Sequence, residues 1–282
     1  MKLLSYLGII LFISTIRFAF AQEINAFQIP HSSVIDIKDP ESGKVYPIFI
    51  KLPRSYNKSN KKTYPVIYLT DAPYTFPIVS GATRFPMNTG KMQEAIIVGI
   101  SYEKGVRGHA SRVSDYTPAK DSSWKLQTGK AQQYMHFITQ SIFPYIQKNY
   151  KVTDSRTFVG NSLGGLLGAY ILFTAPKMFD NYILGSPSVW FKGNDILKIN
   201  PPITLNRHKV FIAVGEHEIP EFNGTVHNMV AGAKQLRLKI SSANFPHTKT
   251  KLLIIGEATH ETAFPTTAIQ GLYWLFKKTG NS

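Results

Sequence analysis

The stretch TFVGNSLGGLLGAYILF, residues 157–173, decides the fold. Its apolar first residues predict a strand, and the small and apolar residues after Ser162 predict a helix. Between them lies GNSLG, which has the form G-x-S-x-G and occurs once in the chain. In this form a sharp turn lifts the serine hydroxyl clear of the backbone, and the helix dipole then favours a developing oxyanion. We therefore predict that Ser162 is a nucleophile.

Strands and helices alternate along the rest of the chain. Short apolar runs bounded by turn residues predict strands at 45–52, 64–69, 95–100, 157–159, 182–184, 210–214 and 252–255. Helices are predicted at 127–150, 163–173, 222–238 and 266–278. This alternation is typical of an α/β fold with a mostly parallel central sheet and helices on both faces. In such sheets the site lies at the carboxyl ends of the strands.

The first residues have the layout of a signal peptide. Lys2 supplies a positive charge, residues 3–16 are almost entirely apolar, and Ala19-Phe20-Ala21 has the small-x-small form of a cleavage site. We expect a signal peptide over 1–21 and a single domain over 22–282, exported to the periplasm or secreted, with no stable membrane insertion after cleavage. An uncleaved anchor helix is the alternative, but the apolar run is short for a membrane span and Arg17 interrupts it.

Composition excludes several kinds of site. The chain has no cysteine, so cysteine nucleophiles, thiolate metal sites and disulfides are excluded. The eight histidines lack metal-ligand spacing, and no phosphate-binding glycine loop is present, so we expect neither a metal nor a cofactor. The net charge of +15 is compatible with anionic partners, but we favour cations spread over a solvated surface, because the sequence has no long basic run. No nucleic-acid module accompanies the charge.

The general base and its acid follow the last two predicted strands. His260 comes after the final strand, in the chain order of nucleophile, acid and histidine that an α/β-hydrolase uses. The loop after residues 210–214 carries three glutamates, of which we favour Glu218 as the acid that orients His260, with Glu216 as the second choice. A serine–histidine pair without an acid remains the alternative.

The oxyanion hole needs two backbone N–H donors. Leu163, which follows the nucleophile, supplies one in this motif. The other is expected from Asp71 or Ala72, just after the predicted strand over 64–69.

Three further side chains are candidates for substrate binding. Arg112 and Tyr116 lie in a long segment after the predicted strand over 95–100, and Trp190 lies in a loop after the strand over 182–184. Long loops at this edge can line a substrate cleft. A pair of Arg112 with Asp115 that braces the loop, and a packed core position for Trp190, are the structural alternatives.

Together these motifs resemble one family. The stretches VIYLTD (66–71), RVSDYTP (112–118), FVGNSLGG (158–165), SPSVW (186–190) and VGE (214–216), with His260, are similar to those of esterases related to enterochelin esterase and the siderophore hydrolase IroE. The resemblance implies an α/β-hydrolase fold and a serine esterase that hydrolyses a small-molecule ester through an acyl-enzyme, without a cofactor. Siderophore catecholate trilactones are one implied, anionic substrate class. An acyltransferase and a non-catalytic binding protein on the same scaffold are the alternative functions.

Overall fold

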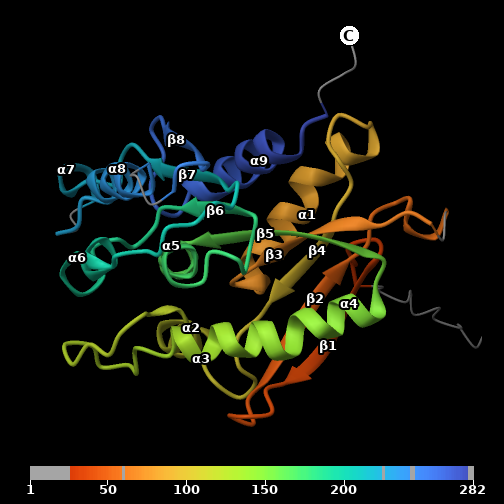
Figure 1. Cartoon of the computed structure of the whole chain (residues 1–282), viewed down its shortest axis with the longest axis horizontal. Helices are drawn as coiled ribbons and strands as arrows, with labels where there is room; N and C mark the ends of the chain where they lie inside the picture. The colour runs from red at the N-terminus through yellow and green to blue at the C-terminus, as the bar shows by residue number, and fades with distance from the viewer. Residues whose placement is uncertain (1–25, 59–60, 224–225, 242–244, 279–282) are drawn as a thin grey trace, which may run out of the picture.

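A single eight-stranded sheet forms the centre of the molecule. The computed structural model describes residues 26–58, 61–223, 226–241 and 245–278, so the expected signal peptide lies outside the described residues. The strand order is β1-β2-β4-β3-β5-β6-β7-β8 (Figure 1). The strands are β1 Ser32–Lys38, β2 Val45–Lys51, β3 Tyr64–Leu69, β4 Ile96–Ile100, β5 Val152–Asn161, β6 Asn181–Gly185, β7 Lys209–Gly215 and β8 Lys249–Ile255.

Most of the sheet is parallel, as the alternating pattern predicts. β2 runs antiparallel to both β1 and β4, whereas every pairing from β4 to β8 is parallel. All seven predicted strands are present, and β5 begins earlier than expected. The prediction missed β1, an edge strand of sequence SSVIDIK in which only one residue is buried. Such a strand lacks the apolar run that marks its neighbours.

The helices follow the predicted alternation, with three additions and one division. They are α1 Ala72–Asn88, α2 Gly108–Tyr116, α3 Ala131–Phe137, α4 Phe143–Asn149, α5 Leu163–Thr174, α6 Phe191–Lys198, α7 Pro220–Asn223, α8 Met229–Ile240 and α9 Ala263–Phe276. A π-helical segment, Ile138–Ile142, joins α3 to α4, so the helix predicted over 127–150 is essentially continuous.

Two helical predictions need correction. The single helix expected over 222–238 is wrong, because the chain forms the short α7 and then α8, whose first turn is capped by the Asn228 side chain accepting from the Ala231 N–H. No helix was expected at α1, which contains Pro77 and Pro86 in its interior. Proline normally breaks a helix, so its sequence obscured this element.

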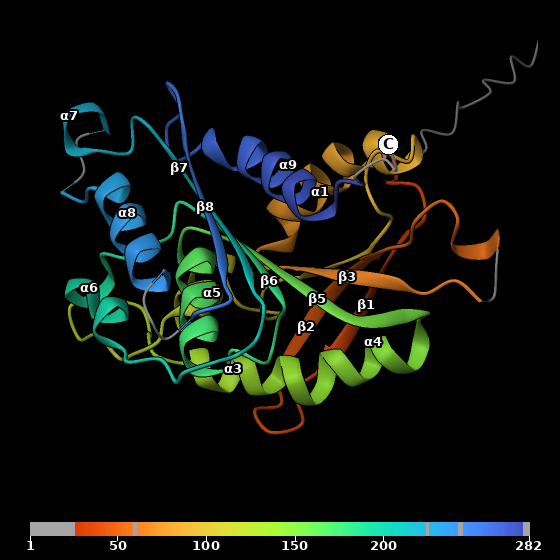
Figure 2. The ribbon, with the colours of Figure 1, turned by 45° about the horizontal axis from the view of Figure 1, so that its top comes forward.

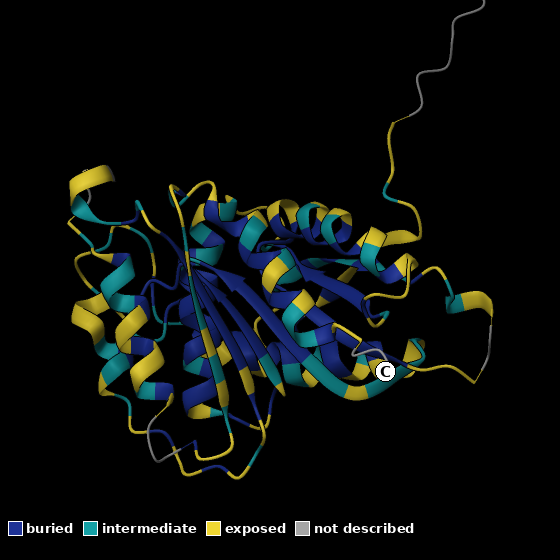
Figure 3. Cartoon of the chain, turned by 90° about the horizontal axis from the view of Figure 1, so that it is seen from above, coloured by how far each residue is buried: buried dark blue, intermediate teal, exposed yellow. Residues whose placement is uncertain are grey.

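The helices cover both faces of the sheet, which confirms the α/β-hydrolase fold class. α1 and α9 pack side by side on one face, where a core cluster joins Phe76 and Val79 to Phe264 and Leu272 (Figures 1 and 2). α2, α3, α5 and α8 lie on the other face. The central strands are buried along most of their length (Figure 3).

This topology gathers several loops at one edge of the sheet. Since β3, β5, β6, β7 and β8 are parallel, their carboxyl ends lie at the same edge. Asp71, Ser162, Ser186, Glu218 and His260 each follow one of these strands. The sequence separations between them are large, but the parallel register brings the five loops together.

Candidate active site

The turn at Ser162 has the geometry of a nucleophile elbow. Its φ of 59° and ψ of −117° lie in a region that is strained for a residue with a side chain. A Cβ added at Gly160 would lie 2.3 Å from the Gly164 carbonyl oxygen, so only glycine permits this close approach of helix to strand. The Ser162 N–H donates to the Gly185 carbonyl at 2.9 Å. The serine is thus held between β5 and the start of α5.

Glu218 and His260 are in direct polar contact at this edge. His260 Nδ1 lies 2.6 Å from Glu218 Oε2. The Glu218 side chain is fully buried, whereas that of His260 is 34% exposed. Because an ionised carboxylate only accepts hydrogen bonds, the imidazole places its proton on Nδ1 and leaves Nε2 as an acceptor. That is the tautomer a general base requires.

Two further donors fix the Glu218 carboxylate. Ser186 Oγ donates to Oε1 at 2.5 Å, and the Gly215 N–H donates to the same oxygen at 2.7 Å. A buried carboxylate is costly unless its oxygens are bonded in this way. Glu216, the second choice of acid, instead accepts from the Glu257 N–H at 3.0 Å and is exposed. Among the described residues, Glu218 is the carboxylate in contact with His260.

In this conformation the Ser162 hydroxyl faces Ser188 and not His260. Its Oγ lies 3.3 Å from Ser188 Oγ, and no hydrogen bond joins it to His260 among the described side chains. Ser188 is 1% exposed, and its N–H also donates to the Ser162 carbonyl at 3.1 Å. Neither Ser186 nor Ser188 was predicted as a site residue. The SPSVW stretch that contains both was the available signal.

Two helix starts supply the candidate oxyanion donors. Leu163 and Ala72 are the first residues of α5 and α1, so their N–H groups have no acceptor in their own helix. Neither donates to any other described residue. Asp71, by contrast, donates its N–H to Tyr116 Oη at 3.2 Å. Of the two residues expected at this loop, Ala72 therefore has the uncommitted N–H.

Arg112 holds the loop that carries these donors. Its Nε donates to Asp71 Oδ1 at 2.8 Å and its Nη2 to Oδ2 at 3.3 Å. Asp71 has a left-handed φ of 55°, which is uncommon outside glycine and asparagine. Tyr116 is 1% exposed and, with Arg112, fixes Asp71 from beneath the site. Arg112 and Tyr116, two of the three residues expected to bind substrate, thus contact Asp71 in the loop before α1, and the expected pairing of Arg112 with Asp115 is replaced by one with Asp71.

Trp190 lies in a stack of three aromatic rings. Its ring is parallel to that of His227 at 3.9 Å between centroids, and to that of Trp124 at 6.2 Å. Partial burial lowers the pKa of His227, which favours a neutral ring in this stack. Trp190 is half-buried and follows Ser188 by two residues, and Ser188 in turn contacts Ser162.

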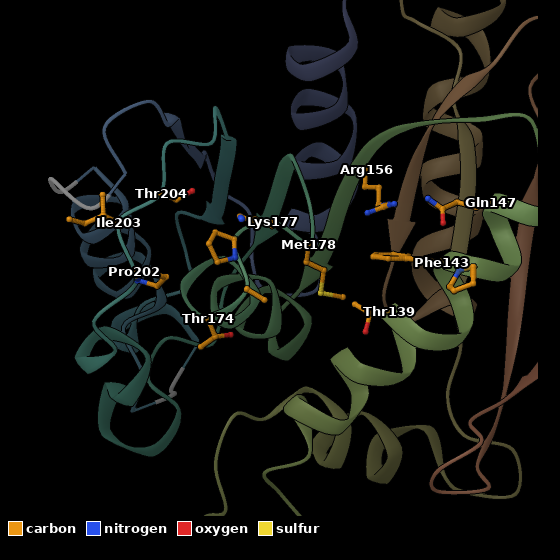
Figure 4. Close-up of a pocket in the computed structure, with 13 residues that line it drawn as sticks. Thr139, Phe143, Gln147, Arg156, Thr174, Lys177, Met178, Pro202, Ile203 and Thr204 are labelled. Carbon is orange, nitrogen blue, oxygen red and sulfur yellow. The ribbon is translucent and has the colours of Figure 1, made fainter.

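One sizeable cavity lies away from the candidate residues. It has a volume of about 670 Å³ and lies at the opposite edge of the sheet between α4, the start of β5 and the end of α5, where Arg156 covers Phe143 (Figure 4). It contains none of the candidate residues.

In the described part of the chain, no three His, Asp or Glu side chains gather as metal ligands. No helix there is both long and apolar enough to cross a membrane.

Comparisons with known proteins agree on one family. The family model described as "Putative esterase" matches residues 40–261. Ferri-bacillibactin esterase BesA of Bacillus subtilis is 33% identical, over 69% of this chain and 73% of the relative. A siderophore triacetylfusarinine C esterase of Aspergillus fumigatus is 32% identical over 56% of each chain. The crystal structure of the BES protein from Bacillus cereus has a TM-score of 0.75 and 26% identity, covering 90% of this chain and 98% of that one.

Proposed function

Because this chain belongs to the putative esterase family, we propose that it is a serine esterase that acts through an acyl-enzyme. Ser162 is the nucleophile, His260 the general base and Glu218 the acid that orients it. The single observation that carries this proposal is the 2.6 Å contact between His260 Nδ1 and the buried Glu218 carboxylate, beside the elbow that presents Ser162.

The first half of the reaction forms the acyl-enzyme. Ser162 Oγ attacks the ester carbonyl carbon while His260 Nε2 takes the hydroxyl proton. The carbonyl oxygen becomes an oxyanion, which accepts hydrogen bonds from the N–H groups of Leu163 and Ala72. The imidazolium that forms is stabilised by Glu218. As the carbon–oxygen bond to the alcohol breaks, His260 returns its proton to the leaving oxygen.

The second half releases the acid. His260 removes a proton from water, whose oxygen attacks the acyl carbon through a second oxyanion. The bond to Ser162 Oγ then breaks, and His260 returns the proton to the serine. Both halves require Ser162 Oγ to turn from Ser188 toward His260, which is a rotation about one side-chain bond. Apo active sites often hold such contacts long or misaligned.

Siderophore esters are the substrate class we propose. Two relatives above 30% identity carry the names of siderophore esterases, one for ferri-bacillibactin and one for triacetylfusarinine C. The net charge of +15 is compatible with an anionic ferric catecholate trilactone.

The test compares hydrolysis of p-nitrophenyl esters and of a ferric catecholate trilactone by the wild type, Ser162→Ala and Ser33→Ala. Ser33 is exposed on β1 and serves as the matched control. We expect turnover by the wild type and by Ser33→Ala, none above background by Ser162→Ala, and a strong preference for the trilactone. Mass spectrometry after a fluorophosphonate should find the adduct on Ser162. Full activity of Ser162→Ala would exclude the serine mechanism. Activity on the trilactone no higher than on p-nitrophenyl esters would exclude siderophore trilactones as the substrate class.

A further inference from the structure

A second pocket lies at the edge of the sheet remote from Ser162. It has a volume of about 520 Å³ and is formed by the first described residues, the end of β2 and the second half of α1. We call it the α1–β2 pocket; its lining includes Phe27, Lys51, Arg54, Ser80, Arg84 and Asn88. β2 is antiparallel to β4, with Lys51 opposite Ile97, so Lys51 lies toward the amino end of the parallel strands.

Three cations of this pocket lack an acidic partner. Lys51, Arg54 and Arg84 form no ion pair with any described carboxylate. Burial, and then the charge of Arg84, lower the pKa of Lys51. Like charges held together in one pocket repel one another, and a bound anion would relieve that repulsion. The pocket therefore has the charge of an anion site.

A buried hydroxyl supplies an independent observation. Ser80 lines the same pocket, is 2% exposed, and its Oγ has no hydrogen-bond partner among the described residues. A buried hydroxyl without a partner costs free energy, which a bound oxygen acceptor would recover. The threonine one turn later in the helix, Thr83, bonds to the Val79 carbonyl instead. Ser80 thus brings an unused hydroxyl to the pocket wall, and Asn88 adds a side-chain amide to the same lining.

Exposed aromatic side chains accompany the charge. Phe27, in the pocket wall, is 91% exposed, and Phe85, next to Arg84, is 77% exposed. Figure 2 shows the first described residues beside the second half of α1. Basic residues with exposed aromatic rings are the combination by which proteins lie on anionic bilayers, where the rings enter the interface and the cations bind headgroup phosphates. A small soluble anion would not need the two phenylalanines.

We propose that the α1–β2 pocket binds the phosphate group of an anionic phospholipid and seats the enzyme on a membrane surface. The orientation that results leaves the catalytic edge clear of the bilayer. α1 begins at Ala72, beside Ser162, and Arg84 lies twelve residues further on, about 18 Å along the helix. The lipid contact and the ester-binding edge therefore lie at opposite ends of α1.

The test measures co-sedimentation with vesicles of phosphatidylcholine, with and without phosphatidylglycerol, using the chain from Gln22, which contains every described residue. The pocket variant is Lys51→Gln/Arg54→Gln/Arg84→Gln. The control, Lys209→Gln/Lys234→Gln/Arg237→Gln, removes the same charge from exposed positions on β7 and α8. We expect the wild type and the control to bind only the anionic vesicles, and the pocket variant to bind about a hundredfold more weakly.

Further arms separate this proposal from its alternatives. Phe27→Ala/Phe85→Ala should also weaken vesicle binding, and both glutamine variants should hydrolyse a soluble ester like the wild type. Equal loss in the pocket and control variants would show diffuse attraction and overturn the proposal. The proposal would also be overturned if calorimetry showed pocket-dependent binding of inorganic phosphate while neither the wild type nor any variant bound vesicles. Failure of the esterase proposal would leave these binding outcomes unchanged.

Discussion

Glu218 Oε2 lies 2.6 Å from His260 Nδ1, although the carboxylate is fully buried and the imidazole is one-third exposed. The contact therefore joins the protein interior to the surface at the carboxyl ends of the parallel strands. The three hydrogen bonds to the Glu218 carboxylate come from Ser186 after β6, Gly215 at the end of β7 and His260 after β8. The orientation of His260 consequently depends on the register of three neighbouring strands.

Replacing Glu218 by Gln should reverse the tautomer of His260. The amide nitrogen would donate to Nδ1, which forces the imidazole proton onto Nε2, where it blocks proton removal from Ser162. We expect kcat to fall by about a thousandfold with KM little changed, since triads lose up to about 10⁴-fold in this way. Steady-state kinetics on a p-nitrophenyl ester measure the loss. Glu216→Gln is the matched control and should retain wild-type kinetics.

Removing the Ser188 hydroxyl should leave catalysis intact. The side chain contacts Ser162 Oγ at 3.3 Å, but the proposed mechanism gives it no proton to move. We expect kcat/KM of Ser188→Ala to stay within about threefold of wild type, because loss of one hydroxyl contact is worth about 1 kcal/mol or less. Progress curves on the same ester measure it. A hundredfold loss would instead give Ser188 a direct role.

Breaking the Arg112–Asp71 pair should cost stability as well as activity. Arg112→Met leaves the Asp71 side chain, which is 5% exposed, without its cation. Uncompensated buried charges destabilise by about 3 kcal/mol. We expect urea denaturation to show a loss near that size, and Asp71→Asn/Arg112→Met to recover part of it. Arg237→Met on the exposed face of α8 should be close to neutral; equal losses at both sites would remove any special role for the pair.

A methyl group at Gly160 should be far more damaging than one at Gly81. The Gly160 Cβ would lie 2.3 Å from the Gly164 carbonyl oxygen, whereas that of Gly81 in α1 meets nothing within 4 Å. We expect Gly160→Ala to destabilise by at least about 2 kcal/mol and Gly81→Ala to stabilise by about 0.5–1 kcal/mol. Thermal unfolding of the two variants, measured side by side, checks both signs. Similar melting temperatures would contradict the helix–strand spacing.

His208 should make stability fall in mild acid. Its side chain is buried, and burial lowers its pKa below the ordinary value of 6.5. Just below pH 6.5 the unfolded chain then binds a proton that the folded chain does not, so the free energy of unfolding decreases as the pH falls. Melting temperatures measured from pH 7.5 to 5.5 should decline more steeply for the wild type than for His208→Gln. Parallel profiles would rule out this contribution.

The fold could be predicted from the sequence where burial on both faces leaves a continuous apolar run. YPVIYL in β3 and IIVGI in β4 are buried at every position, so their sequence identifies them. β1 and α1 were not predicted, because neither has the sequence pattern that is typical of the element it forms. β1 is mostly exposed, and α1 contains two interior prolines whose cost is offset by packing against α9.

The candidate site was likewise only partly predictable from the sequence. Ser162, Glu218 and His260 could be proposed because each follows a strand in a fixed order, and parallel strands bring those positions together. The pairing of Arg112 with Asp71 could not be predicted, because the two residues are 41 positions apart in the sequence and meet only through tertiary packing. The same holds for Ser186, which reaches Glu218 from the neighbouring strand end.

The open ends of the sheet have a consequence for solubility. β1 and β8 each have a single neighbour in the described sheet, so one edge of each presents unpaired backbone groups. Such edges can recruit strands from other molecules and seed aggregates. β8 counters this with lysines at Lys249 and Lys251, and β1 with Asp36 and Lys38, all exposed. A share of the basic charge thus protects the chain from edge-to-edge association with its own copies.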